Sequence, residues 1–366
     1  MSLAEVAVHN LRNIEHTKIE LSSEVNLFFG ENGSGKTSLL EAVYLLSTGK
    51  SFRTSTHKNL IKEGQSSCIV SGIVRQHEVQ ERQISTQIGI AKFPNSSELR
   101  INGVTVKQRS ELARLLPLLI VTPTSHQLLD AGPHWRRQYL DWGVFHVEHF
   151  FGQTWGMYKR GLQQRNSLIS EGLRGTRDRD VLSSIDKELG RLGQQIDQSR
   201  QAYFASLLPL LVTTVSALLD FEDIQFEFKS GTPSGMDFPE YLVSGLSQDL
   251  RRGRTLHGPH TADLKVKIGK YEAKEVLSRG QQKLLVYALL LAQITLFKKQ
   301  TGRHTTLALD DVSSELDQQR FEQLVWLLKE QFSQLLITSV NKEDLKLQPF
   351  SDCAMFHVKH GTVNSI

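Results

Sequence analysis

The segment that decides the fold of this chain is Gly30-Glu31-Asn32-Gly33-Ser34-Gly35-Lys36-Thr37. It matches the phosphate-binding pattern in which two glycines, with four residues between them, are followed by a lysine and a hydroxyl residue. An apolar run at residues 25–29 precedes the segment, and residues 38–47 follow it with leucine and valine at helical spacing. A buried strand, a glycine-rich turn and a helix form the context that such a loop requires. The segment therefore predicts an α/β nucleotide-binding fold.

The residue types in this loop suit a nucleoside triphosphate. Its glycines allow backbone N–H groups to turn inward around the β-phosphate, and the following helix presents its positive end. We expect Lys36 to reach the β- and γ-phosphates and Thr37 to ligate Mg²⁺. The alternative is a glycine-rich turn that arises by chance. The flanking strand and helix favour the first interpretation, in which every residue from Gly30 to Ser38 contributes to binding ATP.

Two carboxylates follow a second apolar strand, at residues 307–309. Asp310 ends that strand, where a Walker-B acid holds Mg²⁺, often through water. Asp311 is placed to orient or deprotonate an attacking water. The alternative is that the two acids merely begin a surface turn. Because aspartate is one methylene shorter than the glutamate of many such ATPases, we expect slow hydrolysis.

A third motif, called here the Ser-Gly turn, is Leu277-Ser278-Arg279-Gly280-Gln281-Gln282-Lys283, which leads into an apolar helix. Serine is a good helix cap, and glycine permits close approach of another backbone. The turn therefore predicts a second anion site at a helix N-terminus. Because residues 30–37 already enclose one nucleotide, we expect Ser278 and Gly280 to contact the γ-phosphate of ATP bound by a second subunit. An ordinary helix cap is the alternative.

The run Ser313-Ser314-Glu315-Leu316-Asp317 follows the two acids. It either caps the next helix or, in a face-to-face dimer, lies across the interface near the nucleotide of the partner.

The composition indicates a globular protein, with 39% hydrophobic and 22% charged residues among 366. The net charge of +4 is compatible with nucleic acid but does not identify it as a ligand. Cys68 and Cys353 are too far apart in sequence to suggest a zinc site or a disulfide framework. The N-terminus lacks the pattern of a signal peptide, and the apolar run at residues 284–297 is too short for a membrane span. We expect a cytoplasmic protein without a membrane segment.

The middle of the chain differs from its ends. Residues 66–107 contain strand-like runs and the hairpin signal Asn102-Gly103, which together predict an antiparallel β-subdomain. From about residue 132 to residue 219 the pattern is helical, with an apolar stripe at residues 182–196. The stripe lasts about three heptads and is followed by Pro209, so we expect a compact helical lobe rather than a long coiled-coil arm.

In this order the three motifs resemble the ABC-type ATPases of DNA maintenance, the class that contains the SMC heads. Within that class the chain is similar to the RecF family of bacterial recombination-repair ATPases, over nearly its whole length. Besides the P-loop and the Ser-Gly turn, the similar segments are Leu11-Arg12-Asn13, Gly49-Lys50-Ser51-Phe52-Arg53-Thr54, Gly132-Pro133 with Arg136-Arg137 and Leu140-Asp141, and the run at residues 310–317. One departure is that Thr261-Ala262 follows Gly258-Pro259-His260, where the resemblance leads us to expect an Arg-Asp pair.

The resemblance implies an α/β fold, namely an ABC-type P-loop ATPase head with an antiparallel β-subdomain and an inserted helical lobe. We expect the ATPase domain at residues 1–130 and 255–366, with its β-subdomain at about 66–107, and the helical insertion at 131–254. The resemblance also implies nucleotide contacts by Arg12, Asn13 and Asp317.

In function, the resemblance implies a weak, DNA-stimulated ATPase that forms an ATP-dependent homodimer. It further implies binding to duplex DNA and to the single-strand/double-strand junctions of gaps, and work with RecO and RecR to help RecA load. Candidate phosphate-contacting residues are basic positions of the helical lobe, which include a short run at 251–254: Arg136, Arg137, Lys159, Arg160, Arg165, Arg251, Arg252 and Arg254. For each of these, a solvated face or an internal ion pair is the alternative.

Two other functions use the same ATPase motifs. The nucleotide-binding subunit of a membrane transporter would explain all three motifs, but not the helical lobe or the segments at 49–54 and 132–141. An SMC-like structural ATPase would require a long arm, which the short apolar stripe does not provide.

Overall fold

The computed structural model describes residues 2–77, 83–219, 221, 223–312, 318–331, 334–347 and 350–366. The chain forms two compact units, one from residues 1–125 with 283–366 and the other from residues 126–282. The expected run at 313–317, with Asp317, lies outside the described residues.

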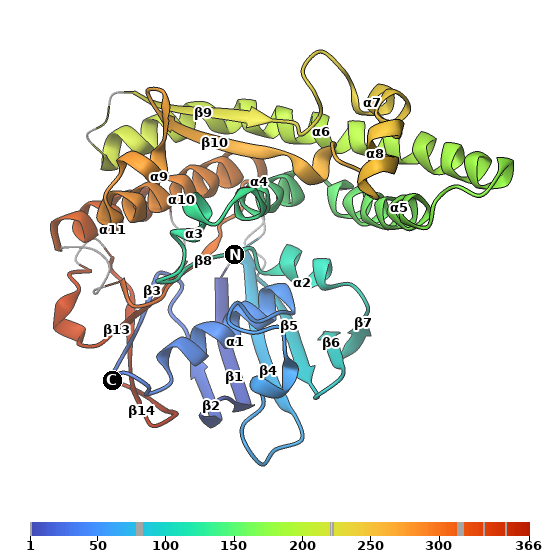
Figure 1. The fold of residues 1–366 in the computed structure, drawn as a ribbon. Coiled ribbons are helices and arrows are strands. Elements are labelled where there is room, and N and C mark those ends of the chain that lie inside the picture. The colour runs from blue at the N-terminus through green and yellow to red at the C-terminus, as the bar shows by residue number, and fades with distance from the viewer. Residues whose placement is uncertain are drawn as a thin grey trace. The chain divides into compact units, whose positions relative to one another are not determined.

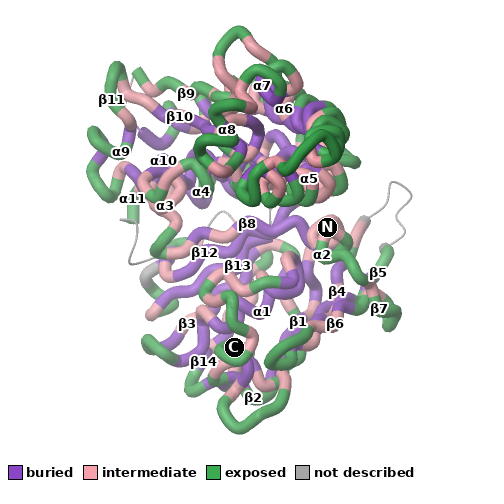
Figure 2. The backbone as a smooth tube through the Cα atoms, turned by 45° about the vertical axis from the view of Figure 1, so that its right-hand side comes forward, coloured by how far each residue is buried: buried purple, intermediate pink, exposed green. Residues whose placement is uncertain are grey.

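A mostly parallel sheet forms the centre of the first unit, with the strand order β15-β14-β3-β13-β12-β8. Its strands are β3 (Val25–Phe29), β8 (Leu118–Val121), β12 (Thr306–Leu309), β13 (Gln334–Ser339), β14 (Cys353–Lys359) and β15 (Thr362–Ser365). The neighbours from β14 to β8 are parallel, and β15 is antiparallel to β14. Both faces of β12 and β13 are buried, as the purple trace in Figure 2 shows, which explains their continuous apolar sequence.

The second sheet of this unit is antiparallel, with the order β2-β1-β4-β5-β6-β7. Its strands are β1 (Ser2–Leu11), β2 (Ile14–Glu20), β4 (Cys68–His77), β5 (Gln83–Lys92), β6 (Ser97–Ile101) and β7 (Val104–Val106). Four of these strands lie within the expected subdomain at 66–107, but β1 also pairs with β4, so the subdomain includes the N-terminus of the chain. The predicted hairpin is confirmed, because Asn102 and Gly103 have φ angles of 49° and 80° between β6 and β7.

Helix α1 (Lys36–Thr48) joins the two sheets through its apolar side chains. Leu39, Leu45 and Leu46 are buried in one core with residues of both sheets, such as Val70 and Leu336. The other helices that belong wholly to this unit are α2 (Arg109–Leu115) and α11 (Gln318–Gln331). The core thus anchors the helix that begins at the phosphate-binding loop.

The second unit combines helices with a small sheet (Figure 1). Its helices are α3 (Gln127–Asp130), α4 (Pro133–Val147), α5 (Phe151–Glu171), α6 (Thr176–Leu218), α7 (Phe238–Ser244), α8 (Leu246–Arg252) and α9 (Ala273–Val276), and α10 (Arg279–Thr301) begins in this unit and continues into the first. Its antiparallel sheet has the order β11-β10-β9, with β9 (Ile224–Lys229), β10 (Asp263–Ile268) and β11 (Tyr271–Glu272).

The division of the chain differs from the expected one at its second boundary. The first boundary lies after residue 125 instead of 130, and the second lies after residue 282 instead of 254. The reason is strand pairing: β10 follows residue 254 in the chain, yet its six residues pair with β9, which belongs to the second unit. The inserted lobe is therefore not purely helical.

Helix α6 continues through Pro209 and contains 43 residues, a length of about 65 Å. The buried face also extends beyond the expected stripe at residues 182–196, because Leu207, Leu211 and Val215 continue it on both sides of Pro209. Proline in a helix interior removes a backbone hydrogen bond, which costs about 3 kcal/mol or more. Burial of the apolar face offsets this cost.

One 18-residue window of α6 has a mean hydropathy of 1.5, which by length and composition alone would allow a membrane span. In this window 28% of the residues are buried inside the protein. A helix of a globular protein that buries one apolar face can have the same length and mean hydropathy. These two properties alone are therefore weak evidence for a membrane span.

Buried ion pairs hold the second unit together. The Arg165 side chain has no exposed surface and contacts Asp186 and Asp249, each at 2.6 Å. Arg136 pairs with Asp263 at 2.7 Å, and both side chains are buried. Two of the candidate DNA-contacting residues, Arg136 and Arg165, are therefore internal. The exposed members of the set are Lys159, Arg160, Arg251, Arg252 and Arg254.

Asp249 generates a prediction about stability. Its carboxylate accepts hydrogen bonds from Arg165 at 2.6 Å, the Tyr241 hydroxyl at 2.7 Å and the Leu256 N–H at 3.0 Å. Asp249→Asn leaves the buried Arg165 guanidinium with less compensation, so we expect a loss of about 3–5 kcal/mol in the free energy of unfolding. Urea denaturation followed by tryptophan fluorescence measures it.

The matched control is Glu188→Gln, which breaks a surface pair with Arg191. We expect little change there, because both partners are solvated. Equal losses of unfolding free energy in the two variants would contradict the idea that burial makes the Asp249–Arg165 pair the more important one.

Candidate nucleotide-binding site

The loop at residues 30–37 has the conformation that its glycines predict. Gly30 has a φ of 153°, and a Cβ atom there would lie 2.1 Å from the carbonyl oxygen of Val358. Gly35 has a φ of 121° and directly precedes α1. Among the described residues no side chain caps this helix and no acid lies in its first turn, so its positive end is available to an anion.

Two polar atoms of the loop fit a bound phosphate. Lys36 Nζ contacts the carbonyl oxygens of Gly30 and Glu31, the latter at 3.0 Å. Burial lowers the pKa of Lys36, while Asp311 and Asp310 act in the opposite direction. Ser34 Oγ is buried and has no hydrogen-bond partner among the described residues. A phosphate oxygen would give Lys36 Nζ, which has three N–H donors, a third acceptor and would give Ser34 Oγ its first partner.

The N-terminal hairpin supports the loop from one side. Asn13 Nδ2 donates to the carbonyl oxygens of Gly33 and Ser34, at 3.3 and 3.1 Å, and Asn13 Oδ1 accepts from Ser38 Oγ at 3.3 Å. Both polar atoms of the Asn13 side chain therefore form hydrogen bonds with the loop and the residue after it. Asn13 also lines the pocket, and its contact with nucleotide stays a prediction.

The metal-binding residues that the sequence predicts are brought together. Thr37 Oγ1 lies 3.0 and 3.2 Å from the two carboxylate oxygens of Asp310. Thr338 Oγ1 donates to the same carboxylate at 2.9 Å. Burial raises the pKa of Asp310, and the hydrogen bonds from Thr338 and Thr37 lower it.

This donor set suits Mg²⁺, which binds oxygen ligands and usually completes its shell with water and substrate phosphates. In the described part of the chain, no group of three or more His, Cys, Asp or Glu side chains could hold a metal by itself. A cation at Thr37 and Asp310 would therefore need the phosphates as further ligands.

Asp311 lies in the same pocket, in a backbone conformation that is unusual for aspartate. Its φ is 54°, and its N–H donates to Thr338 Oγ1 at 2.7 Å. Thr338 thus contacts both acids and fixes the turn between them. Sequence reasoning missed Thr338, although its position at the end of the neighbouring buried strand was a usable signal.

The pocket has a volume of about 360 Å³. It is lined by Arg12, Asn13, Asn32, Gly33, Gly35, Lys36, Thr37, Ser38, Arg53, Asp310, Asp311 and Thr338. Most predicted site residues of the first unit are in this set. Gly30, Glu31 and Ser34 belong to the loop but are not among the residues that line the pocket.

Arg53 is a pocket residue to which the sequence assigned no role. Glu41 on α1, whose side chain is fully buried, binds Arg12 through two hydrogen bonds of 2.8 Å and lies 3.7 Å from Arg53. Ser51 Oγ also donates to Glu41, and it accepts the N–H of Arg53 at 2.9 Å. The segment at residues 49–54 therefore presents a second arginine to the pocket.

The Ser-Gly turn belongs to the second unit, up to Gln282. Ser278 is confirmed as a helix cap, since its Oγ accepts the Gln281 N–H at 3.3 Å and Gln281 Oε1 accepts the Ser278 N–H at 2.9 Å. Ser278 and Gly280 are exposed, and a Cβ atom at Gly280 would meet no described atom within 4 Å. Packing within the chain does not require glycine at this position.

The unexpected Thr261-Ala262 pair fits its own surroundings. Thr261 Oγ1 donates to the carbonyl oxygens of Gly231 and Gly258, at 3.1 and 2.9 Å. Ala262 is buried, and its carbonyl oxygen accepts a bond of 2.7 Å from Arg137. The pair thus closes the turn without charged side chains.

Comparison with known proteins identifies the family. Residues 2–363 match the family described as RecF/RecN/SMC N terminal domain. The DNA replication and repair protein RecF of Stutzerimonas stutzeri (strain A1501) is 38% identical over 369 residues, which cover 100% of this chain and 98% of that protein. The chain belongs to the RecF family. RecF of Pseudoalteromonas translucida (strain TAC 125) is also 38% identical, with 99% of each chain covered.

Solved structures agree with this family assignment. A structure of the recombination mediator protein RecF with ATP, in the RecFOR pathway, has a TM-score of 0.87 and 27% identity, and the match covers 100% of this chain and 97% of that one. The Smc head domain of Pyrococcus furiosus, at 15% identity and a TM-score of 0.59, shares the fold, with 100% and 96% covered. These matches confirm the predicted ABC-type fold. They include the second unit, which the transporter alternative leaves unexplained.

The buried side chain of Lys92 leads us to predict how the stability of the protein depends on pH. Its buried Nζ donates to the Gly49 carbonyl oxygen at 2.8 Å, and burial lowers its pKa from 10.5 to about 8. Between these values the unfolded chain binds more protons than the folded chain, so stability rises with pH. In urea denaturation at pH 8 and pH 10, we expect the wild type to gain stability relative to Lys92→Met.

Lys58→Met is the control, because Lys58 is an exposed lysine near the same segment. If the stability of Lys92→Met and that of the wild type change equally between pH 8 and pH 10, the buried lysine does not titrate in this pH range.

Proposed function

We propose that this protein is an ATP-switched, DNA-binding homodimer that acts in recombinational repair and in the repair of replication gaps. The observation that carries the proposal is the convergence of Thr37 and Asp310, at 3.0 Å, beside a phosphate loop that follows strand β3. The relatives support it, since they are DNA replication and repair proteins and solved RecF structures contain ATP or an ATP analogue.

Each residue of the pocket has a distinct task in this proposal. Thr37 and Asp310 would hold Mg²⁺, which when bound neutralises phosphate charge. Lys36 and Arg53 would bind phosphate oxygens, because both cations line the pocket. Asp311 would accept a hydrogen bond from the attacking water and orient it.

Slow hydrolysis is part of the proposal. The Asp311 side chain is one methylene shorter than glutamate, so its carboxylate would reach less far toward an attacking water molecule. A weak ATPase, stimulated by DNA, suits a switch in which ATP holds the dimer and hydrolysis releases it.

The composite site explains why two subunits are needed. Ser278 and Gly280 are exposed at the start of a long helix, and Gly280 leaves room for an approaching group. In the dimer they would contact the γ-phosphate bound by the partner. Asp317 would lie near that interface.

DNA is the proposed ligand of the dimer, both as duplex and at single-strand/double-strand junctions. The exposed basic residues on α5 and in the last turn of α8, such as Lys159 and Arg251, are available for phosphate contacts that do not depend on sequence. RecR and RecO are the proposed protein partners, with the loading of RecA as the outcome. The expected location is the cytoplasm.

Ser278→Arg tests the composite site. The larger cationic side chain would fill the space that the γ-phosphate of the partner needs. We expect ATP-dependent dimerisation, measured by sedimentation with and without ATP and gapped DNA, to be lost while each monomer still binds ATP. A variant that dimerises like the wild type would exclude the role of Ser278 across the interface. Ser170→Arg, on the exposed face of α5, serves as the control for added charge.

Lys36→Arg tests the phosphate loop. Arginine keeps the positive charge but replaces a compact ammonium with a planar fork, so phosphate positions shift. We expect ATP binding, measured by fluorescence titration, to persist while turnover falls by about tenfold or more. Turnover equal to that of the wild type would rule out the assigned role of Lys36.

A further inference from the structure

A closed series of contacts, called here the ring, leaves the Ser-Gly turn, passes through the second unit and returns to the turn, by way of charged and polar side chains and the backbone carbonyls of Leu129 and Lys274. At its first end, Arg279 Nη1 contacts Asp130 Oδ2 of α3 at 3.0 Å. The same nitrogen lies 3.5 Å from Gln282 Oε1. Arg279 and Gln282 both belong to the turn, so the ring begins and ends on it.

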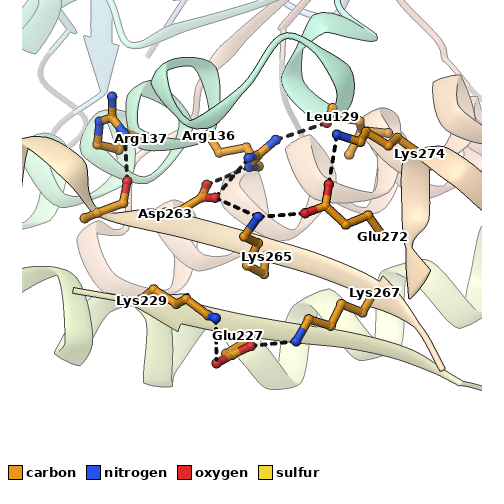
Figure 3. Close-up of polar contacts among 11 residues, drawn as sticks. Leu129, Arg136, Arg137, Glu227, Lys229, Asp263, Lys265, Lys267, Glu272 and Lys274 are labelled. Carbon is orange, nitrogen blue, oxygen red and sulfur yellow. Dashed lines mark hydrogen bonds and ion pairs between the residues drawn. The ribbon is translucent and has the colours of Figure 1, made fainter. Parts of the chain in front are cut away.

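The ring continues from α3 into the interior of the second unit. The carbonyl oxygen of Leu129, next to Asp130 in sequence, accepts a bond of 3.0 Å from Arg136 Nη1. Arg136 binds both oxygens of Asp263, at 2.7 and 3.0 Å, as Figure 3 shows. Arg136 and Asp263 are each only 6% exposed. This doubly bonded pair is the rigid part of the ring.

Two lysines and one glutamate carry the ring back to the turn (Figure 3). Lys265 Nζ lies 3.5 Å from Asp263 and 2.7 Å from Glu272, and Lys274 Nζ lies 2.9 Å from Glu272. These lysines, Lys265 first and then Lys274, lower the pKa of Glu272 to about 2. Glu272 thus ties β10 to α9.

Gln282 closes the ring. Its Nε2 donates to the carbonyl oxygens of Lys274 and Leu277, each at 3.1 Å. The side chain of Gln282 is therefore bonded to the end of α9 on one side and to Arg279 on the other. Ser278 and Gly280 lie in sequence between these fixed points.

A second ion-pair group on the same sheet provides a contrast. Glu227 of β9 contacts Lys229 at 3.7 Å and Lys267 at 3.0 Å. Figure 3 shows this trio apart from the ring, and among the described residues its ion pairs do not include any residue of the Ser-Gly turn. Stabilisation of the sheet alone would need only pairs of this kind.

We propose that this ring is a positioning device that sets the Ser-Gly turn for the partner subunit's nucleotide. The inference rests on the proposed function of Ser278 and Gly280, which would touch the γ-phosphate. The ring residues act through the turn and do not touch nucleotide themselves. Its members are Asp130, Arg136, Asp263, Lys265, Glu272, Lys274, Arg279 and Gln282.

Glu272 is the best position at which to open the ring. Its side chain and those of Lys265 and Lys274 are between 27% and 36% exposed, so water can solvate the two lysines after the carboxylate is neutralised. The buried Arg136–Asp263 pair stays intact in Glu272→Gln. The fold should therefore persist while α9 and the turn lose a fixed anchor.

The test compares Glu272→Gln with Glu227→Gln in the full-length protein. Each substitution removes one carboxylate that contacts two lysines of the same unit, but only Glu272 belongs to the ring. Sedimentation with ATP and Mg²⁺ measures dimerisation, and fluorescence titration measures ATP binding by the monomer. We expect Glu272→Gln to weaken dimerisation about tenfold, with ATP affinity unchanged, and Glu227→Gln to change neither.

Glu272→Asp, which keeps the charge, should recover part of the loss. If Glu272→Gln dimerises like Glu227→Gln, the ring does not position the turn. Ser278→Arg, measured in parallel, separates this result from failure of the proposed function. If Ser278→Arg loses ATP-dependent dimerisation while Glu272→Gln dimerises like the wild type, only the positioning role of the ring is wrong. If Ser278→Arg itself dimerises like the wild type, the proposed composite site is wrong.

Discussion

The carboxylate of Asp310 is the contact point on which the phosphate site depends. It accepts hydrogen bonds from Thr37, which follows the loop, and from Thr338 at the end of β13. Strand β13 lies between β3 and β12, so parallel pairing places the carboxyl ends of all three strands at one edge of the sheet. Neighbouring strands are about 4.8 Å apart. Side chains that follow β3 and β12, on either side of β13, can therefore meet and share one cation, as the 3.0 Å contact between Thr37 and Asp310 shows.

The same edge explains why helix α1 must be held firmly. Its first turn supplies Lys36 and Thr37, and its interior supplies the buried Glu41 that binds Arg12 and orients Arg53. A substitution that changes how Leu39 or Leu46 packs against the core would shift the helix and would move all of these groups together. Precise placement of the phosphate ligands is thus a result of core packing.

The second unit uses a different kind of stabilisation. Its interior contains arginine side chains with aspartate partners, such as Arg165 with Asp249 and Arg200 with Asp141. Such pairs cost desolvation energy and tolerate little change in geometry. Rigidity of this kind suits a unit that would have to hold a short exposed turn in one orientation for a second subunit.

The sequence by itself determined the elements with local signals. Gly30, Gly35, Lys36 and Thr37 specify the loop through backbone freedom and side-chain chemistry, and Asn102-Gly103 specifies a hairpin. Only the tertiary structure decided that α6 passes through Pro209 and that β10 joins the second unit. It also decided that Arg136 and Arg165 are internal and that Arg53 and Thr338 enter the pocket. Except for Thr338, whose position at the end of a buried strand was a local signal, these outcomes depend on burial and on pairing between residues far apart in the chain, which the local sequence does not specify.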